Sequence, residues 1–243
     1  MALISYDSVD AAAFEADRHL SADALGGWRD AIGRHFDPRP GTRILDLGCG
    51  TGTWARAFRT WWPGVDVLAV EPSPAMRDRA VFQPIAPGTA DNLPFPDAGL
   101  DGVWLSTVIH HVPDLAAAAR EIRRVLKPDA PVMIRSVFRG RHHAISLFHW
   151  FPEAIGVLDR YPTVSEVEAA FAITGLATVG CEPVPQVTAP SLAHAAASLR
   201  REAHTPLQLI SDHAYEAGVA RLREAARTQA GPVVDALDLL VLR

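Results

Sequence analysis

Short apolar runs and longer amphipathic segments alternate along residues 43–136, and this alternation predicts the secondary structure of the chain. The apolar runs predict strands at 43–47, 66–70, 100–105 and 131–137, with a weaker one at 84–86. Between them, apolar residues recur at helical spacing over 51–62, 73–80 and 114–127, where Asp114 is suited to cap the helix. Strands that alternate with helices are typical of a parallel sheet covered on both faces.

The segments on either side of this alternation predict further helices and two more strands. Residues 8–36 carry apolar side chains at helical intervals, and Thr163 and Glu166 are spaced for a capping box at the start of another helix. The remaining predicted elements are strands at 177–184 and 235–243, with helices at 191–203 and 212–228 between them. We expect the final strand to be antiparallel.

These elements together predict the fold class and the division of the chain. We expect an α/β fold with a Rossmann-like, seven-stranded, mostly parallel sheet that is flanked by helices and has an antiparallel last strand. A chain of 243 residues, 49% of them hydrophobic and 21% charged, is suited to one packed domain over 1–243. Its expected parts are N-terminal helices at 8–36, a core at 41–137, and lid or substrate elements at 138–175 and 190–230.

The charge pattern narrows the expected partners to small molecules. The net charge is −5, and no run of lysine or arginine offers a patch for a phosphate backbone or an anionic membrane. We therefore expect neither nucleic acid nor membrane as a partner, and the absence of a signal-like start favours a cytoplasmic protein. Cys49 and Cys181 have neither a disulfide framework nor a metal-ligand spacing, so we expect no metal site.

The strongest chemical signal is a glycine-rich loop between the first strand and the helix that follows it. Gly48, Gly50 and Gly52 alternate there; such glycines let a ligand approach the backbone, while the helix N-terminus attracts its negative groups. Glu71 closes the second strand about twenty residues later, where a carboxylate can accept hydrogen bonds from both ribose hydroxyls. The loop and the acid predict a nucleoside-containing cofactor, and the Gly-x-Gly-x-Gly spacing argues against a dinucleotide.

Three motifs in order, DLGCGTG, VEPSPAM and GTADNLPFPD, resemble the class I S-adenosylmethionine-dependent methyltransferases, especially their ubiquinone-biosynthesis-type branch. The resemblance covers residues 43–136 and implies S-adenosyl-L-methionine as the cofactor. It implies that Glu71 holds the ribose and that Pro72 and Met76 pack near the adenine. The residues implied around the methionine part are Asp46, Gly48, Cys49 and Gly50, with Gly52 supporting the turn.

The resemblance is looser at the adenine and at the N-terminus. The adenine motif is matched by Thr89, Ala90, Asp91 and Asn92. Thr89 stands where the family usually has an acid, so either its hydroxyl or Asp91 would bind the adenine amine. The backbone near Ser106 is expected to meet the cofactor. Arg18, in the N-terminal helices, would pair with the methionine carboxylate or simply belong to an amphipathic helix.

Two histidines are candidates for acid–base chemistry. Methyl transfer depends mostly on positioning, and a base helps when the acceptor has a proton to lose. His110 and His111 follow the fourth strand, and either is suited to be that base because histidine titrates near neutral pH. The alternative is that the pair is structural and supports the loop before Asp114.

A second cluster, at 139–151, is rich in aromatic, histidine and arginine side chains, and we expect it to line an acceptor pocket or form a lid. Arg139 and Arg141 would favour an anionic acceptor or be solvated at the surface. The histidines between 142 and 149 lack an acidic or cysteine partner at ligand spacing, which favours helix packing over metal binding.

The resemblance predicts an enzyme that transfers a methyl group from S-adenosylmethionine to a C, N, O or S atom of a small molecule. An alternative is a non-methylative use of the same cofactor, in a cyclisation or decarboxylation. A third hypothesis is a non-enzymatic nucleoside-binding module, against which the intact glycine loop and Glu71 argue. The helices at 191–228 would form a substrate cap or the surface of a homodimer.

Overall fold

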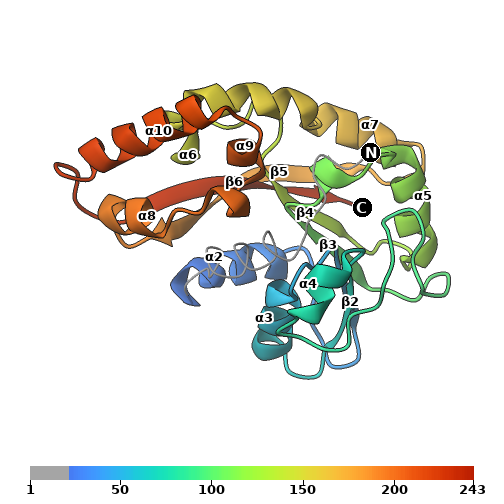
Figure 1. The fold of residues 1–243 in the computed structure, drawn as a ribbon. Coiled ribbons are helices and arrows are strands. Elements are labelled where there is room, and N and C mark those ends of the chain that lie inside the picture. The colour runs from blue at the N-terminus through green and yellow to red at the C-terminus, as the bar shows by residue number, and fades with distance from the viewer. Residues whose placement is uncertain (1–21) are drawn as a thin grey trace.

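A six-stranded mixed sheet forms the centre of the protein (Figure 1). The computed structural model describes residues 22–243, with side chains from residue 25 onward. The strands are β1 (Arg43–Leu47), β2 (Asp66–Val70), β3 (Gly102–Ser106), β4 (Val132–Ser136), β5 (Thr178–Ala189) and β6 (Val233–Leu242), in the order β2-β1-β3-β4-β6-β5. Strands β1 to β4 are parallel, and β6 runs antiparallel to both β4 and β5, which confirms the predicted direction of the last strand.

The sheet of the described residues has six strands, so the expected count of seven is not confirmed. The weak strand predicted at 84–86 is reduced to one parallel bridge between Ala86 and Val70 at the outer edge of β2. Ala86 donates its N–H to the Ala69 carbonyl (2.9 Å) and accepts from the Glu71 N–H (3.1 Å). Pro84 and Pro87 flank this bridge, and because proline has no N–H to donate, the pairing cannot continue as a ladder.

The predicted helices that follow the strands are present, and local hydrogen bonds account for the starts of three of the four. They are α3 (Thr53–Trp61), α4 (Pro74–Asp78), α5 (Leu115–Val125) and α7 (Val164–Ala172). Asp114 caps α5 by accepting the Ala117 N–H at 2.9 Å. At the start of α7, Thr163 and Glu166 form the predicted capping box, which satisfies two backbone donors reciprocally.

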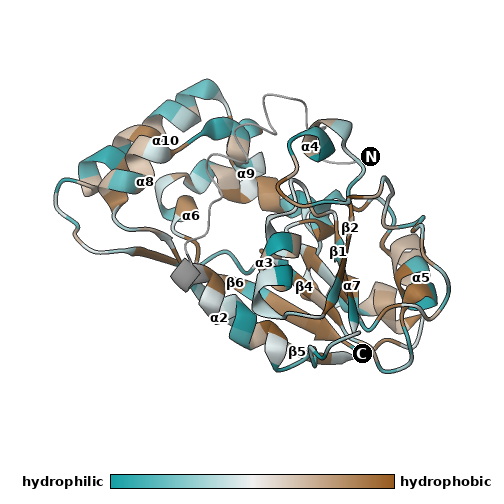
Figure 2. Ribbon diagram, turned by 90° about the horizontal axis from the view of Figure 1, so that it is seen from below, coloured by the Kyte–Doolittle hydropathy of each residue, from teal (hydrophilic) through white to brown (hydrophobic). Residues whose placement is uncertain are grey.

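Each face of the sheet has its own hydrophobic cluster. In Figure 2 the central strands are largely coloured as hydrophobic, with α2 and α3 on one side of them and α5 on the other. On one face, Ile122 of α5 and Phe171 of α7 pack against residues of β1, β3 and β4. The other face is covered by α3 and by α2 (Ala22–Gly33), and its cluster is aromatic. The Trp54 ring centroid lies 5.0 Å from that of Trp104 and 6.1 Å from that of Trp28. The side chains of Trp104 and Trp28 are fully buried. This tryptophan cluster fixes α2 and α3 against the strands that end at the site.

Strands β5 and β6 continue past the rest of the sheet as a two-stranded ribbon. Only residues 238–242 of β6 pair with β4, whereas β5 pairs with β6 along its whole length. We call residues 184–189 and 233–237 the ribbon. Ala236 donates its N–H to the Ala144 carbonyl at 2.9 Å, which joins the ribbon to the segment that follows β4.

A helical cap lies over the ribbon in Figure 1. The cap consists of α6 (Leu147–Trp150), η2 (Pro152–Arg160), α8 (Leu192–Ser198), η3 (Arg201–Ala203), α9 (Thr205–Gln208) and α10 (Asp212–Ala225). The helix predicted over 191–203 ends at Leu199 and resumes as the short η3, while α10 matches its prediction closely. Phe151 and Leu207 belong to the apolar cluster that holds α6, η2, α9 and α10 together. None of the helices in the described part of the chain is long and apolar enough to cross a membrane.

Candidate cofactor and acceptor site

The glycine loop has a conformation that only glycine adopts without strain. Gly48, Gly50 and Gly52 have φ angles of 69°, 57° and 85°, in the left-handed region. Gly48 and Cys49 both donate their N–H groups to the Val70 carbonyl (2.8 and 3.0 Å), so the loop is fixed to the end of β2. A Cβ at Gly48 would lie 2.6 Å from Cγ2 of Val108, so this position also has no room for a side chain.

Two buried carboxyl groups lie beside the loop. Asp46 is 1% exposed and accepts the Ala55 N–H at 2.9 Å; burial, with a smaller contribution from the charge of Glu71, raises its pKa to about 8. Glu71 accepts the N–H groups of Gly50 and Ser73, both at 2.8 Å, and its pKa is raised by burial although these two hydrogen bonds lower it. Since each carboxylate oxygen can accept two hydrogen bonds, Glu71 retains acceptor capacity for hydroxyl groups.

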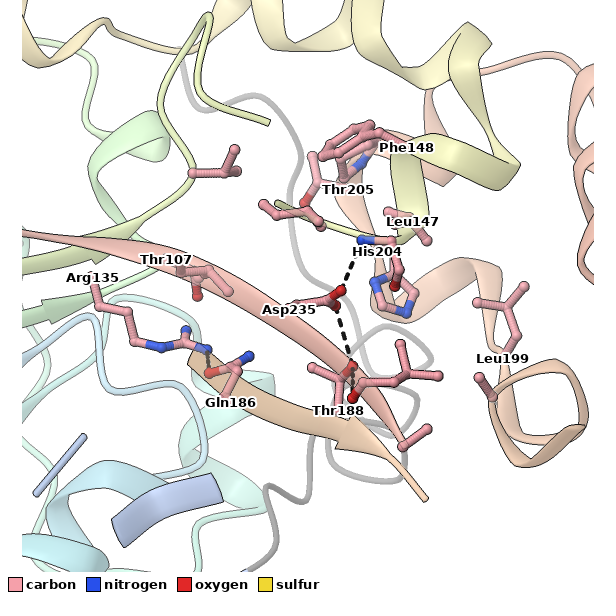
Figure 3. Close-up of a pocket in the computed structure, with 18 of the residues that line it drawn as sticks. Thr107, Arg135, Leu147, Phe148, Gln186, Thr188, Leu199, His204, Thr205 and Asp235 are labelled. Atoms are coloured by element: carbon pink, nitrogen blue, oxygen red, sulfur yellow. Dashed lines mark hydrogen bonds between the residues drawn. The ribbon is translucent and has the colours of Figure 1, made fainter. Parts of the chain in front are cut away.

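A cavity of about 400 Å³ begins at the glycine loop and extends beneath the cap (Figure 3). Five of the predicted site residues line it: Asp46, Gly48, Cys49, Ser106 and His110. The predicted ribose and adenine residues are not part of its lining. Glu71 and Met76 are buried beside it, whereas Pro72, Thr89, Asp91 and Asn92 are exposed and Ala90 is half-buried. Arg18 lies outside the described residues.

The two predicted histidines occupy different positions around the cavity. Both belong to the short helix η1 (Ile109–His111), which follows β3. The His110 ring stacks on Tyr161 with a centroid distance of 4.0 Å and an interplanar angle of 7°. His110 and Tyr161 line the cavity and His111 does not, although the His111 ring lies only 4.2 Å from that of His110.

The sequence analysis missed a buried arginine in the cavity wall. Arg135, in β4, is 6% exposed and donates to Ser106 Oγ (3.2 Å) and to Gln186 Oε1 (2.8 Å). Its guanidinium lies over the Trp28 ring, 4.9 Å from the centroid, and Trp28 donates its indole N–H to the same Gln186 oxygen. A charged residue inside the otherwise apolar strand PVMIRSV was the available signal, since such a residue is rarely buried without function.

Of the two alternatives left open for Arg139 and Arg141, an anionic acceptor or a surface position, their contacts favour the surface position. Arg139 pairs with Glu166 at 2.6 Å, and Arg141 makes a bidentate pair with Asp238 at 2.6 and 2.8 Å. Neither lines the cavity, to which the same segment contributes instead the apolar side chains of Phe148 and Trp150. The described residues contain no group of three or more His, Cys, Asp or Glu side chains that could hold a metal ion.

Comparison with known proteins places this site in a family. The profile of the methyltransferase domain family matches residues 18–180, which is more than half of the chain. The chain belongs to this family. Membership confirms the resemblance to S-adenosylmethionine-dependent methyltransferases, with the glycine loop, Glu71 and the η1 histidines all inside the matched segment. The helical cap lies mostly beyond it.

Named relatives of this chain differ in what they act on. A malonyl-[acyl-carrier protein] O-methyltransferase of Erwinia pyrifoliae is 28% identical over 60% of this chain and 56% of its own length. A ubiquinone/menaquinone biosynthesis C-methyltransferase UbiE of Caulobacter sp. is 35% identical over 45% of this chain and 51% of its own. The chain thus spans about half the length of the curated relatives it matches.

A solved structure supports the fold over most of the chain. It is a putative methyltransferase from an antibiotic biosynthesis pathway of Anabaena variabilis, with a TM-score of 0.68 and 24% identity. The match covers 88% of this chain and 95% of that one, so it includes the region of the cap as well as the parallel core.

Proposed function

We propose that this chain transfers the methyl group of S-adenosylmethionine to a small-molecule acceptor bound beneath the cap. The observation that carries the proposal is the continuous cavity that joins the glycine loop to the cap. A volume of about 400 Å³ is in the range of pockets that bind small molecules. The names of the relatives favour methyl transfer over the cyclisation or decarboxylation alternative.

The residues around the loop fit the proposed cofactor. The left-handed conformation of Gly48 and Gly50 shapes the loop for the methionine part, and the N-terminus of α3, where Asp46 accepts the Ala55 N–H, adds a positive dipole end there. Glu71 has the remaining lone pairs that two ribose hydroxyls require. When bound, S-adenosylmethionine supplies a methyl group activated by its sulfonium; the chain supplies the orientation. Met76, Thr89 and Asp91 would lie on the adenine side.

Within this proposal, His110 is the base and His111 its neighbour. His110 lines the same cavity as Ser106 and Gly48, so it is a candidate to take a proton from an acceptor bound there. Stacking on Tyr161 holds the His110 ring plane in one orientation, which preserves the geometry that proton transfer needs. The acceptor site itself would be shaped by Arg135 and by the aromatic side chains of the cap.

The proposal is tested by incubating the purified chain with methyl-labelled S-adenosylmethionine and fractionated metabolite extracts. We expect one labelled small molecule and an equal amount of S-adenosylhomocysteine. Conversion of a metabolite without S-adenosylhomocysteine would overturn methyl transfer in favour of the non-methylative alternative. Absence of cofactor binding by calorimetry would overturn the site as a whole. The homodimer and the cytoplasmic location stay predictions.

A further inference from the structure

A buried carboxylate lies in the part of the cavity that is remote from the glycine loop. Asp235, in the ribbon, is 9% exposed and lines the cavity. Its Oδ1 accepts the Ser146 N–H at 2.7 Å, and its Oδ2 accepts the Thr188 hydroxyl at 3.2 Å (Figure 3). In the β5–β6 register Asp235 is opposite Gln186, so the two side chains share one face of the ribbon.

No cation of the described residues forms an ion pair with Asp235. The arginines of the neighbouring segments pair with other acids: Arg141 with Asp238, Arg201 with Asp212, and Arg221 with Glu153. Arg135 donates to Gln186, which is opposite Asp235, and not to Asp235 itself. The two groups that donate to Asp235 are neutral. An ionised carboxylate is costly to bury unless it is paired, and a ligand that brings a positive charge removes this cost.

The surroundings of Asp235 strengthen an ion pair with a ligand. The cavity lining there combines the apolar side chains of Leu192, Leu199, Leu222 and Val233 with His204 and Thr205, which lie beside Asp235 in Figure 3. Electrostatic attraction and hydrogen bonds are stronger in such a low-dielectric environment than in water. Two of the roughly four lone-pair sites of the Asp235 carboxylate accept the described donors, and an ammonium group with three N–H donors can use the others.

Asp235 is too far along the ribbon to act on the methylated atom. In the β4–β6 register the partner of Arg135 is Leu239, four residues from Asp235, which corresponds to about 13 Å along the strand. The Arg135 side chain reaches from Ser106, at the cofactor end of the cavity, to Gln186, which is opposite Asp235. A group that binds Asp235 is therefore a recognition element, separated from the reacting atom by the body of the molecule that lies along Arg135.

We infer that the acceptor is an elongated molecule with a protonated amine at the end opposite its methylated atom, and that Asp235 binds this amine. The inference rests on the proposed function, because it assumes that the cavity holds the acceptor. It adds a substrate class to the proposed function: a primary or secondary amine with an apolar spacer. It also identifies Asp235 as a specificity-determining residue.

The test uses two probes of equal length and different charge, n-octylamine, protonated at pH 7.5, and n-octanol. Calorimetric titration into the purified full chain is expected to give at least about tenfold tighter binding of the amine, and Asp235→Asn should abolish this preference. Octanol should bind both proteins alike. The same titrations include S-adenosylmethionine: unchanged cofactor affinity with no amine preference would overturn this inference alone, whereas lost cofactor binding in the unsubstituted chain would overturn the proposed function.

Two further variants separate recognition from folding. Asp238→Asn makes the same chemical change on the same strand at a buried residue that pairs with Arg141 outside the cavity lining, and it should keep the full amine preference. Thr188→Val removes one donor but leaves the Asp235 carboxylate in place, so the amine preference should persist or increase. If Asp235 served only to hold the loop before α6, Asp235→Asn would lower the melting temperature without changing the amine-to-alcohol ratio.

Discussion

A single methyl group at Gly48 is expected to damage both stability and cofactor binding. In Gly48→Ala the backbone keeps φ near 69°, where a residue with a Cβ costs about 1–2 kcal/mol. The new Cβ would also lie 2.6 and 2.8 Å from the two Cγ atoms of Val108, and such overpacking costs typically about 1–3 kcal/mol. The sum, about 2–5 kcal/mol, is a large part of a typical stability of 5–15 kcal/mol, taken as an order of magnitude.

Two controls divide this cost into its parts. Gly41 has a φ of 87° and no atom within 4 Å of an added Cβ, so Gly41→Ala measures the backbone contribution alone. Val108→Ala in the Gly48→Ala background removes the clashing methyl groups, and a double-mutant cycle should give a favourable coupling of about 1–3 kcal/mol. Urea denaturation gives the stabilities and calorimetry gives the cofactor affinity. Equal losses for Gly41→Ala and Gly48→Ala, with no coupling to Val108, would refute the reasoning.

Three further predictions concern the charged and titratable groups of the site. Glu71→Gln should weaken S-adenosylmethionine binding by about tenfold to hundredfold, since a hydrogen bond to a charged group contributes about 1.5–3 kcal/mol; unchanged calorimetric affinity would show that the ribose lies elsewhere. The pKa of Asp46 is raised to about 8, above its ordinary value, so the folded state holds a proton that the unfolded state releases. As the pH rises from about 4 to about 8, the unfolding free energy should therefore fall by about 1.4 kcal/mol per pH unit. Asp46→Asn should remove this slope, which urea titrations at several pH values would measure. A slope that survives the substitution would assign the proton to another group. His110→Ala should slow turnover by about 10²-fold or more with little change in cofactor affinity, whereas His111→Ala should have the smaller effect in the same steady-state assay; the reverse ranking would make His111 the base.

Local signals made the parallel core predictable from the sequence. The strand that ends at Leu47, the glycines after it and the caps at Asp114 and Thr163 each depend on residues that are neighbours in the chain. The weak strand predicted at 84–86 is only a single bridge, because the prolines on either side of Ala86 have no N–H to continue the pairing. A prediction based on apolar residues alone does not take this effect of proline into account.

The acceptor side of the site could not be predicted in the same way because its contacts are distant in the sequence. The hydrogen bond between Arg135 and Gln186 joins residues 51 positions apart, and the pair of Arg141 and Asp238 joins residues 97 positions apart. Composition left open whether the arginines at 139 and 141 face an acceptor or solvent, because only strand pairing determines which arginine faces the cavity. Asp235 had no local signal at all, since DALDLLVLR has the pattern of an ordinary strand.

The ribbon beyond β4 separates two tasks that many enzymes combine on one scaffold. The glycine loop is anchored to β2 and packed by α3, whereas the remote part of the cavity is lined by the ribbon, with which β4 does not pair. Residues 190–232 can therefore be exchanged for those of a relative without altering the register of the parallel strands. In such chimaeras the choice of acceptor should follow the transplanted segment while the methyl donor remains the same. The two ends of the ribbon are therefore suitable points at which to exchange segments when selectivity is engineered.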